Sequence, residues 1–368
     1  MATKGSTGES KIKQLPSGSY RAQVMIAGRR HSVTGATKEE VRRKRRELLT
    51  NADKGMLPSS ERWTVGQYLE HWLDNVIKPN RRATTYRDYR NTVYRHAIPM
   101  FGRVKLSKLQ AAHLEALYAE MRGKGLAPKT IKNAHGTIHS ALEHALRHGL
   151  VLRNVAQAVD RPKAKRAEMH VFTWEQAKTL KDAIAGTRWE AMITLAVTTG
   201  MRQGELLGLQ WRDVDLEAGR VHVSRQLDRD KTLSETKTDK GRRVIDLPPF
   251  AVEALRAHRA RQLEHRLGAG PEWEDHGLVF TTYQGRPLGH RNVIREYAKL
   301  LQRAGLPHVE FHGLRHTAAT LMLVQGVPAK VVQEMLGHSQ VSVTLDIYSH
   351  VIPGMGREAA DKLQRLLG

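Results

Sequence analysis

Two arginines and two histidines in the second half of the chain are residue types that bind and activate phosphate esters. Arg202 and Arg315 carry planar guanidinium groups whose paired N–H donors match the nonbridging oxygens of one phosphate. His312 and His338 can donate hydrogen bonds or transfer protons near neutral pH. Together these four side chains could hold a phosphodiester and move protons during its cleavage.

A lysine and a tyrosine could complete this set. Lys237, in the sequence ETKT, can protonate a leaving oxygen as an acid. Tyr348, in DIYSH, is a nucleophile that can form a covalent phosphoester, although a tyrosine near the end of a chain more commonly serves in packing. Acidic residues in a metal-binding array are absent. We therefore expect side chains, with neither a metal ion nor another cofactor, to stabilise the transition-state charge.

Several of these candidate residues also have an alternative role when they are taken alone. Arg202 could form an ion pair with Glu205, three positions further along a helix. Lys237 could be one more charged turn residue. His312 and His316 have a spacing that could coordinate zinc, but no third or fourth ligand is evident. Only the complete combination favours phosphate chemistry over these roles.

The surrounding sequence predicts the elements that must position these residues. Residues 173–176 contain a capping box that begins a largely helical region, and residues 202–209 continue it. The exception is residues 219–247, where alternating apolar residues predict a small antiparallel sheet with a hairpin turn near 238–241. An apolar helical run follows His312. The candidate residues therefore lie on helix ends and on a hairpin.

The chain is long, basic and free of cysteine. Its 368 residues suit two or three domains, and a hydrophobic fraction of 40% is sufficient for folded cores. A net charge of +23 indicates a polyanionic partner such as nucleic acid. No apolar run approaches the roughly eighteen residues of a membrane span, and the polar N-terminus does not resemble a signal peptide. We expect a cytoplasmic, DNA-binding protein with no disulfides and no membrane partner.

The excess positive charge is concentrated in the first half of the chain. Residues 1–62 contain 14 Lys/Arg and 6 Asp/Glu, and residues 63–168 contain 19 and 8. The remaining 200 residues are nearly balanced, with 27 and 23. This distribution indicates that the first half binds phosphates while the second half has another task.

The N-terminal segment predicts a small sheet followed by a basic helix. Alternating apolar residues over 19–26 indicate a strand, with turns on either side. Thr37 and Glu40 form a capping box for a helix that runs to about Leu49. We interpret this unit as a DNA-contacting arm. Its candidate DNA-binding residues are Arg42, Arg43, Arg45 and Arg46.

A linker over residues 51–62 precedes a predicted helical bundle. Thr64 with Gln67, and Ser107 with Gln110, are further capping boxes. A charged, proline-containing linker separates the bundle from the third region. The candidate phosphate contacts of the bundle are Arg81, Arg82, Arg87, Lys129 and Lys132.

The ordered series of motifs resembles the tyrosine recombinases, specifically the phage- and plasmid-type integrases. TGMRQGELLGLQWRDVD is similar to the family's first catalytic-arginine box, and ETKTDKGRRVIDLP is similar to its lysine hairpin. FHGLRHTAAT resembles the His-x-x-Arg box, and LGHSQVSVTLDIYSHV resembles the last box. The motifs span residues 199–351 in the family's order, and no expected catalytic position is missing.

The resemblance implies a mechanism. Tyr348 would attack a phosphodiester, form a 3′-phosphotyrosine and free a 5′-hydroxyl. The two arginines and His338 would bind the scissile phosphate. Lys237 would protonate the leaving oxygen, and His312 would assist proton transfer from the tyrosine. The family religates without ATP and acts as a homotetramer on paired sites, through a four-way Holliday junction.

The resemblance also implies a mainly α, multidomain (α+β) architecture. We expect an arm-type DNA-binding domain in residues 1–55, with a three-stranded sheet plus helix. A helical, SAM-like core-binding domain would follow in residues 62–160. A mostly helical catalytic domain with a small antiparallel sheet would occupy residues 169–368. A tail helix within residues 354–367 would dock on the neighbouring protomer.

These expectations describe a site-specific integrase that integrates or excises a mobile element of a bacterial host. Its partner would be double-stranded DNA at core-type and arm-type sites, and the sequence leaves open whether an excisionase or a DNA-bending protein is needed. A resolvase or topoisomerase of the same chemistry and a non-catalytic DNA-binding regulator are the alternatives. The complete catalytic set opposes the regulator, and a metal-dependent nuclease should lose activity with a chelator.

Overall fold

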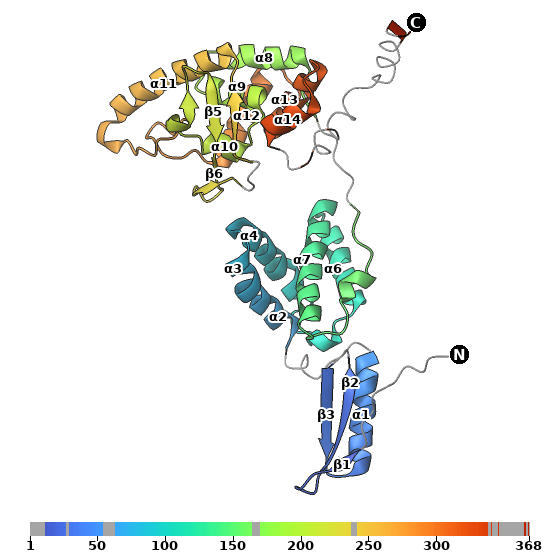
Figure 1. Cartoon of the computed structure of the whole chain (residues 1–368). Helices are drawn as coiled ribbons and strands as arrows, with labels where there is room; N and C mark the ends of the chain where they lie inside the picture. The colour runs from blue at the N-terminus through green and yellow to red at the C-terminus, as the bar shows by residue number, and fades with distance from the viewer. Residues whose placement is uncertain are drawn as a thin grey trace. The chain divides into compact units, whose positions relative to one another are not determined.

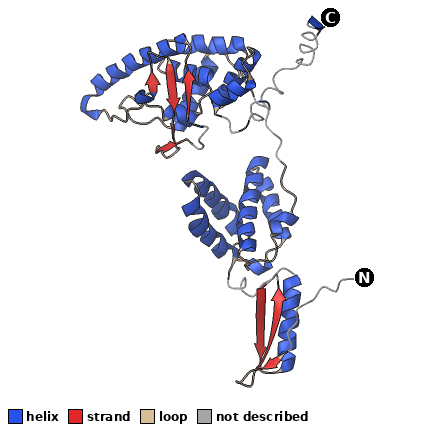
Figure 2. Ribbon diagram, viewed as in Figure 1, coloured by secondary structure: helices blue, strands red, loops and turns tan. Residues whose placement is uncertain are grey.

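The computed structural model divides the chain into two compact units, Met1–Arg166 and Ala167–Gly368 (Figure 1). Helices dominate and are accompanied by small antiparallel sheets, as the sequence predicts (Figure 2). The predicted mainly α, α+β fold is confirmed. The structure describes residues 12–26, 29–53, 63–163, 170–236, 241–337, 340, 345, 364–365 and 367.

A three-stranded antiparallel sheet with one helix begins the first unit. Alternation along the central strand places Ala22, Val24 and Ile26 in a small core, where α1 contributes Val41 and Leu48. The predicted sheet and helix are therefore confirmed. The elements are β1 (Lys13–Gln14), β2 (Tyr20–Ile26), β3 (Arg29–Gly35) and α1 (Lys38–Asp53), in the sheet order β1-β2-β3.

The helix α1 continues past its predicted end at Leu49. It includes residues 51–53, which were expected to begin a linker, because no glycine or proline interrupts the chain before Gly55. The backbone N–H of Glu40 donates to the hydroxyl oxygen of Thr37 across 3.2 Å, which is half of the predicted capping box. The Glu40 carboxylate accepts instead from the backbone N–H of Ala36.

The face of the sheet opposite α1 is polar. Arg21 and Met25 alternate with the buried residues of β2 and are exposed. Cross-strand partners share a face, so the register extends this surface onto β1 and β3. Its members are Lys13, Arg21, Gln23, Met25, Arg30, Ser32 and Thr34.

A helical bundle forms the rest of the first unit and encloses its own apolar core. Tyr68, Trp72, Phe101 and Leu114 are among the buried residues of this core. The helices are α2 (Val65–Trp72), α3 (Lys78–Asn80), α4 (Ala83–Thr92), α5 (Ile98–Phe101), α6 (Ala111–Gly123) and α7 (Pro128–Arg147).

One turn of π-helix precedes a proline at two places in this bundle. Leu73–Ile77 joins α2 to α3 ahead of Pro79, and Val93–Ala97 joins α4 to α5 ahead of Pro99. Proline lacks an N–H donor, and its ring collides with the carbonyl four residues earlier in a regular helix. The wider turn relieves that collision and lets each helix continue past its proline.

Two of the predicted capping boxes are present and one is wrong. At Thr64 and Thr173 the threonine side chain accepts from the backbone N–H of the glutamine three positions later. The side chain of that glutamine accepts from the backbone N–H of the threonine in return. Ser107 instead lies buried inside a short 3-10 turn, Leu106–Lys108. The following helix α6 is capped by Gln110, whose partner is His113. The predicted N-cap, Ser107, therefore lies three residues before the actual N-cap, Gln110.

The second unit surrounds an apolar central helix, α9 (Glu190–Thr199), which is buried along almost its whole length. It packs against α8, α11 and α13. The other helices are α8 (Trp174–Ile184), α10 (Gln203–Leu207), α11 (Pro249–Ala269), α12 (His290–Arg303), α13 (Gly313–Val324) and α14 (Ala329–Leu336).

The predicted small antiparallel sheet over 219–247 is confirmed, and it also includes an earlier strand, β4. Three strands pair in the order β4-β5-β8, and β6 pairs separately with β7. That second pair turns over residues 228–232, while residues 237–240 of the expected turn lie outside the described residues. The strands are β4 (Val214–Asp215), β5 (Arg220–Val223), β6 (Arg225–Leu227), β7 (Leu233–Glu235) and β8 (Arg243–Asp246).

The predicted tail helix within 354–367 falls outside the described residues, apart from positions 364, 365 and 367. Over the part of the chain that the structure does describe, no helix is long and apolar enough to cross a membrane.

Candidate active site

A glycine at the end of α9 starts the candidate site. Gly200 adopts a left-handed conformation, with φ 61°, and ends α9 as its C-cap. A Cβ atom placed there would lie 2.2 Å from Cδ2 of Leu336 on α14. The chain therefore needs glycine for two reasons, the backbone conformation and the close approach of α14.

Arg202 follows this turn as the N-cap of α10. Its Nη1 donates to Oε1 of Glu205 across 2.7 Å, and its backbone N–H donates to Oε2 across 2.9 Å. Its Nη2 also lies 3.4 Å from the carbonyl oxygen of Gly337. The alternative ion pair with Glu205 is thus present. The arginine side chain nevertheless remains 40% exposed, so it can also meet a substrate.

A second arginine, which the sequence analysis did not select, contacts the same carboxylate. Nη2 of Arg243 donates to Oε2 of Glu205 across 2.9 Å, and the Arg243 side chain is only 6% exposed. The signal was available, because alternation along β8 places Arg243 on the same side as the buried Ile245. A charge on the inward side of a strand needs a buried partner.

Arg315 of α13 reaches this cluster from the opposite side. It is 3% exposed, and its Nη1 donates to the carbonyl oxygen of Gly200 across 2.7 Å. Its Nη2 is buried and, among the described residues, makes no hydrogen bond. Burial and the nearby charge of Arg202 lower the pKa of Arg315 to about 9, so it stays protonated at neutral pH.

Glu205 provides the negative charge at the centre of the cluster. Burial alone would raise its pKa, but Arg243 and Arg202 together hold the pKa of Glu205 below its ordinary value. One ionised carboxylate therefore faces three guanidinium groups. The remaining positive charge makes this part of the second unit suitable for an anion such as a phosphodiester.

His312 and His316 lie on the same end of α13, with their ring centroids 5.0 Å apart in an edge-to-face arrangement. Desolvation and the charges of Arg315 and Arg202 lower the pKa of His312. Its side chain reaches solvent, and as a neutral imidazole it can accept a proton. Burial and the neighbouring His312 lower the pKa of His316 to about 4.

Three of the predicted catalytic residues, Lys237, His338 and Tyr348, lie outside the described residues. Gly337 immediately precedes His338 and is described. It ends α14 in a left-handed conformation, and its carbonyl oxygen accepts from Arg202. The chain therefore leaves α14 for His338 from a point that contacts the first arginine.

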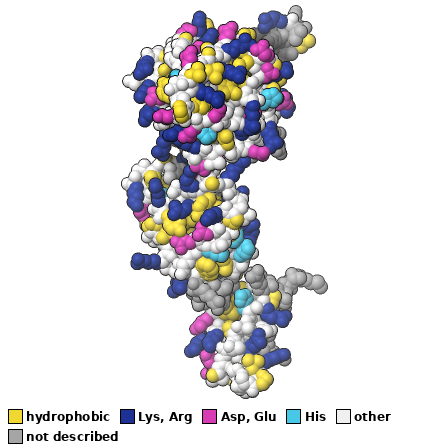
Figure 3. Space-filling view, turned by 90° about the vertical axis from the view of Figure 1, so that its left-hand side faces the viewer, with side chains coloured by type: hydrophobic (Ala, Val, Ile, Leu, Met, Phe, Trp, Pro, Cys, Tyr) yellow, Lys and Arg dark blue, Asp and Glu magenta, His cyan; other side chains and the backbone are white. Residues whose placement is uncertain are grey.

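The predicted DNA-binding residues lie on the first unit. Arg45 and Lys132 are half-buried and the other seven are exposed. Figure 3 shows that Lys and Arg side chains lie at the surface of the sheet-and-helix part and of the bundle. The nine residues are Arg42, Arg43, Arg45 and Arg46 on α1, Arg81 and Arg82 between α3 and α4, Arg87 on α4, and Lys129 and Lys132 on α7.

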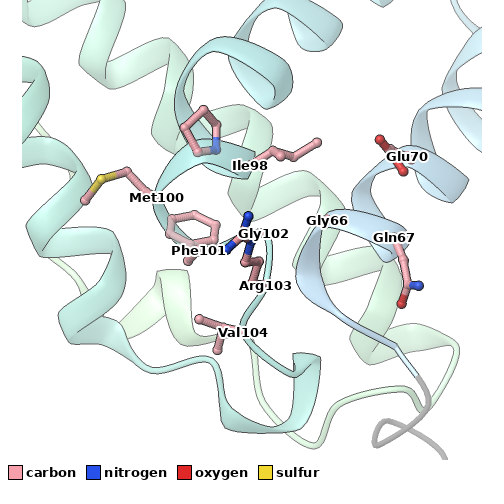
Figure 4. A pocket seen from close by; sticks show the side chains of 10 residues that line it. Gly66, Gln67, Glu70, Ile98, Met100, Phe101, Gly102, Arg103 and Val104 are labelled. Carbon is pink, nitrogen blue, oxygen red and sulfur yellow. The ribbon is translucent and has the colours of Figure 1, made fainter.

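A cavity of about 650 Å³ lies in the bundle, between the start of α2 and the end of α5 (Figure 4). Its wall combines apolar groups such as Phe101 with Glu70 and Arg103. Gly66 and Gly102 meet here through a hydrogen bond of 2.9 Å between their backbones. None of the residues selected for phosphate chemistry lines this cavity, so we place the active site at the arginine cluster.

Comparison with known proteins agrees with the fold. Residues 170–354 match the phage integrase family, and residues 64–122 match the N-terminal SAM-like domain of phage integrases. The chain is 33% identical to a XerC-like tyrosine recombinase of Caldanaerobacter subterraneus, over 90% of each chain. It is 28% identical to an integrase of Saccharopolyspora erythraea, over 91% of this chain and 90% of that protein.

Two groups of solved structures share the fold. The Tn1549 transposon integrase in complex with a circular intermediate DNA superposes with a TM-score of 0.70 at 22% identity, over 82% of this chain and 99% of that chain. A lambda integrase tetramer bound to a Holliday junction gives a TM-score of 0.62 at 17% identity, over 91% and 94%.

The fold and the convergent arginines define an enzyme class, the tyrosine recombinases, which break and rejoin DNA strands. The chain belongs to the phage integrase family within that class. The predicted family and the predicted activity, site-specific DNA recombination, are confirmed.

Proposed function

We propose that the chain integrates and excises a mobile genetic element, and that it does so through a covalent 3′-phosphotyrosine at Tyr348. One observation carries the assignment of the site: Arg202 and Arg315, which are distant in sequence, converge at the turn of Gly200. Arg315 also has a buried donor nitrogen that lacks a partner among the described residues. A nonbridging phosphate oxygen would satisfy that donor.

The proposed chemistry conserves the number of phosphoester bonds. The phenol oxygen of Tyr348 attacks phosphorus, and its proton passes to His312. The bond between phosphorus and the 5′ oxygen breaks, and that oxygen takes a proton from Lys237. The arginines and His338 stabilise the charge on the phosphate in the transition state. Attack by a 5′-hydroxyl of a second duplex reverses the step and exchanges strands.

We infer three functional domains. Residues 169–368 would form the catalytic domain with its tail helix, and residues 62–160 would form the core-binding domain. Residues 1–55 would form an arm-type DNA-binding domain. The separate apolar cores of the sheet-and-helix part and of the bundle support the last two assignments. The bundle would grip phosphates through the exposed arginines around α4 and the lysines at the start of α7.

Two faces of the arm domain could contact a duplex. The outer face of α1 presents Arg42, Arg43 and Arg46, which suit phosphates. The open face of the sheet combines the cations of Arg21 and Arg30 with side chains that can read base edges. We favour the sheet face, because Gln23, Ser32 and Thr34 on it can hydrogen-bond to base edges, and contacts with base edges carry the sequence information.

The active assembly would be a homotetramer on paired DNA sites in the cytoplasm of a bacterial host. The solved complexes of the Tn1549 integrase with a circular intermediate DNA and of a lambda integrase tetramer with a Holliday junction support this proposal by analogy. Comparing reactions with and without host extract tests whether an excisionase or a DNA-bending protein is needed to set the direction of recombination.

The direct test uses a nicked duplex from which the cleaved 5′ fragment diffuses away, so that the covalent intermediate accumulates. The site is first selected from a random-sequence pool by binding to the full chain. We expect a protein–DNA adduct that survives EDTA and denaturation and is lost in Tyr348→Phe. An adduct that still forms after this substitution would show that a residue other than Tyr348 is the nucleophile. Site binding without any adduct would instead support a DNA-binding regulator.

A further inference from the structure

All three nitrogens of the Arg243 guanidinium group donate hydrogen bonds within the protein. Nη2 donates to Glu205 across 2.9 Å, Nη1 donates to the carbonyl oxygen of Gly241 across 3.0 Å, and Nε donates to the carbonyl oxygen of Met335. The side chain is buried, unlike that of Arg202. Because it is buried and each of its nitrogens already donates to a protein oxygen, Arg243 is organised to hold protein groups in place.

The bond to Met335 matters because of where this carbonyl lies. Met335 is in the last turn of α14, whose final carbonyl groups have no partner within the helix and carry partial negative charge. Arg243 binds the carbonyl of Met335, and Arg202 binds that of Gly337, two residues later. Glu205 forms an ion pair with each of these arginines. The end of α14 is therefore bound by two arginines that share one carboxylate.

We infer that Arg243 is a positioning residue for DNA cleavage, which fixes the end of α14 against Glu205 and Arg202 and so places the segment that continues to the nucleophile. The inference rests on the proposed function, in which Tyr348 is that nucleophile. Without Arg243, the last turn of α14 keeps its apolar packing, but its hydrogen bonding to the described part of this cluster is reduced to the longer bond from Arg202 to Gly337. Glu205 also loses the more buried of its two cationic partners.

Arg243 could instead act through its own strand, β8, because Lys237 precedes this strand by six residues in the sequence. A substrate with sulfur in place of the bridging 5′ oxygen separates the two roles. The leaving thiolate needs no proton, since a thiol is a far stronger acid than an alcohol. A defect that reflects a misplaced Lys237 disappears with this substrate, whereas a defect in the placement of the nucleophile persists.

The experiment compares the full-length wild type with Arg243→Met and Arg243→Lys on the selected nicked duplex. Site affinity, thermal melting and the single-turnover rate of adduct formation are measured. Arg220→Met is the matched control, because Arg220 forms an exposed ion pair with Asp246 between β5 and β8. A fourth variant, Lys237→Ala, is the positive control for the sulfur substrate, because it lacks the proposed proton donor.

We expect Arg243→Met to bind the site within about twofold of wild type and to cleave it at least about tenfold more slowly, as expected for an interaction that acts on the chemical step. Arg243→Lys keeps a cation beside Glu205 but cannot reach all three oxygen atoms at once, so its rate should be intermediate. The sulfur substrate should rescue Lys237→Ala and leave Arg243→Met slow. Arg220→Met should match the wild type.

If Arg243→Met does not fold, Arg243→Lys decides the question by the same comparison of rate with affinity. If the Arg243 variants form the adduct at the wild-type rate, or if the sulfur substrate rescues their defect, the inference about Arg243 is wrong. The proposed function is unaffected by either result. A wild-type chain that forms no adduct at all overturns the proposed function and the inference with it.

Discussion

Arg315 donates a hydrogen bond from Nη1 to the carbonyl oxygen of Gly200 across 2.7 Å, although the two residues are 115 positions apart. Gly200 ends α9, and Arg202 follows it by two residues. One buried contact therefore brings the arginine of α13 to the turn that carries the other arginine. The same turn admits Leu336 of α14, so three helices meet around a residue without a side chain.

Replacing Gly200 with alanine should destabilise the protein strongly. The new Cβ would require a left-handed backbone and would collide with Leu336, and we expect a loss of about 3 kcal/mol of unfolding free energy from strain and overpacking together. Urea denaturation followed by circular dichroism measures this loss.

Gly186 provides the matched control for Gly200. It also has a positive φ, of 70°, but an added Cβ would meet nothing within 4 Å. Gly186→Ala should therefore cost only the backbone term, about 1 kcal/mol. Equal losses at the two positions would show that the close approach of Leu336 contributes nothing.

Replacing Glu205 with glutamine should destabilise the arginine cluster and weaken the acid dependence of stability. The folded-state pKa of Glu205 lies below its unfolded value of about 4.5. Its contribution is therefore complete above that pH and is lost as pH falls through the lower folded pKa. We expect Glu205→Gln to lose about 3 kcal/mol at pH 7, because it leaves buried arginines uncompensated.

The measurement for Glu205 is urea denaturation of both proteins from pH 7 to pH 3. The difference in unfolding free energy between the two proteins should shrink as pH falls below about 4.5, because the unfolded wild-type chain takes up a proton at Glu205 before the folded protein does. A difference between the two proteins that stays constant down to pH 3 would contradict the assignment of an ionised Glu205.

Replacing His316 with glutamine should remove a different pH dependence. The folded-state pKa of His316 is about 4, below the ordinary value of 6.5, so the unfolded chain takes up the proton first. Wild-type stability should consequently fall as pH decreases from about 6.5 towards 4, and His316→Gln should lose that part of the slope. Denaturation at pH 7, 6 and 5 tests this, with the exposed His308→Gln as control. Equal slopes in all three proteins would refute it.

The sheet face of the arm domain should contribute more to DNA binding than the outer face of α1. We expect Arg21→Ala with Arg30→Ala to reduce the salt dependence of affinity, lowering the log–log slope by about 1 for each phosphate contact that is lost. The double variant Arg42→Ala with Arg46→Ala is the matched control, because it removes the same charge from the outer face of α1. Fluorescence anisotropy with a labelled duplex between 50 and 200 mM salt compares them. A larger effect of the α1 pair would reassign the contact face.

Local patterns in the sequence predicted much of the fold. Alternation in β2 identified its buried face, and the capping boxes at Thr64 and Thr173 marked two helix starts. These signals succeed because a strand face or a helix cap depends on residues a few positions apart. The box at Ser107 failed because the polar spacing recurs by chance and burial decided which residue begins the helix.

The sequence by itself determined the residue types of the site, their order along the chain and the family to which they belong. Only the tertiary structure decided that Glu205 is shared by Arg202 and Arg243, and that Gly200 receives both Arg315 and Leu336. The physical reason is that a buried charge must be neutralised by whatever packing brings near it. The pair of Arg202 and Glu205 follows from a local spacing, but Arg243, Arg315 and Leu336 come from helices and a strand far apart in the chain, and no local spacing records their contacts.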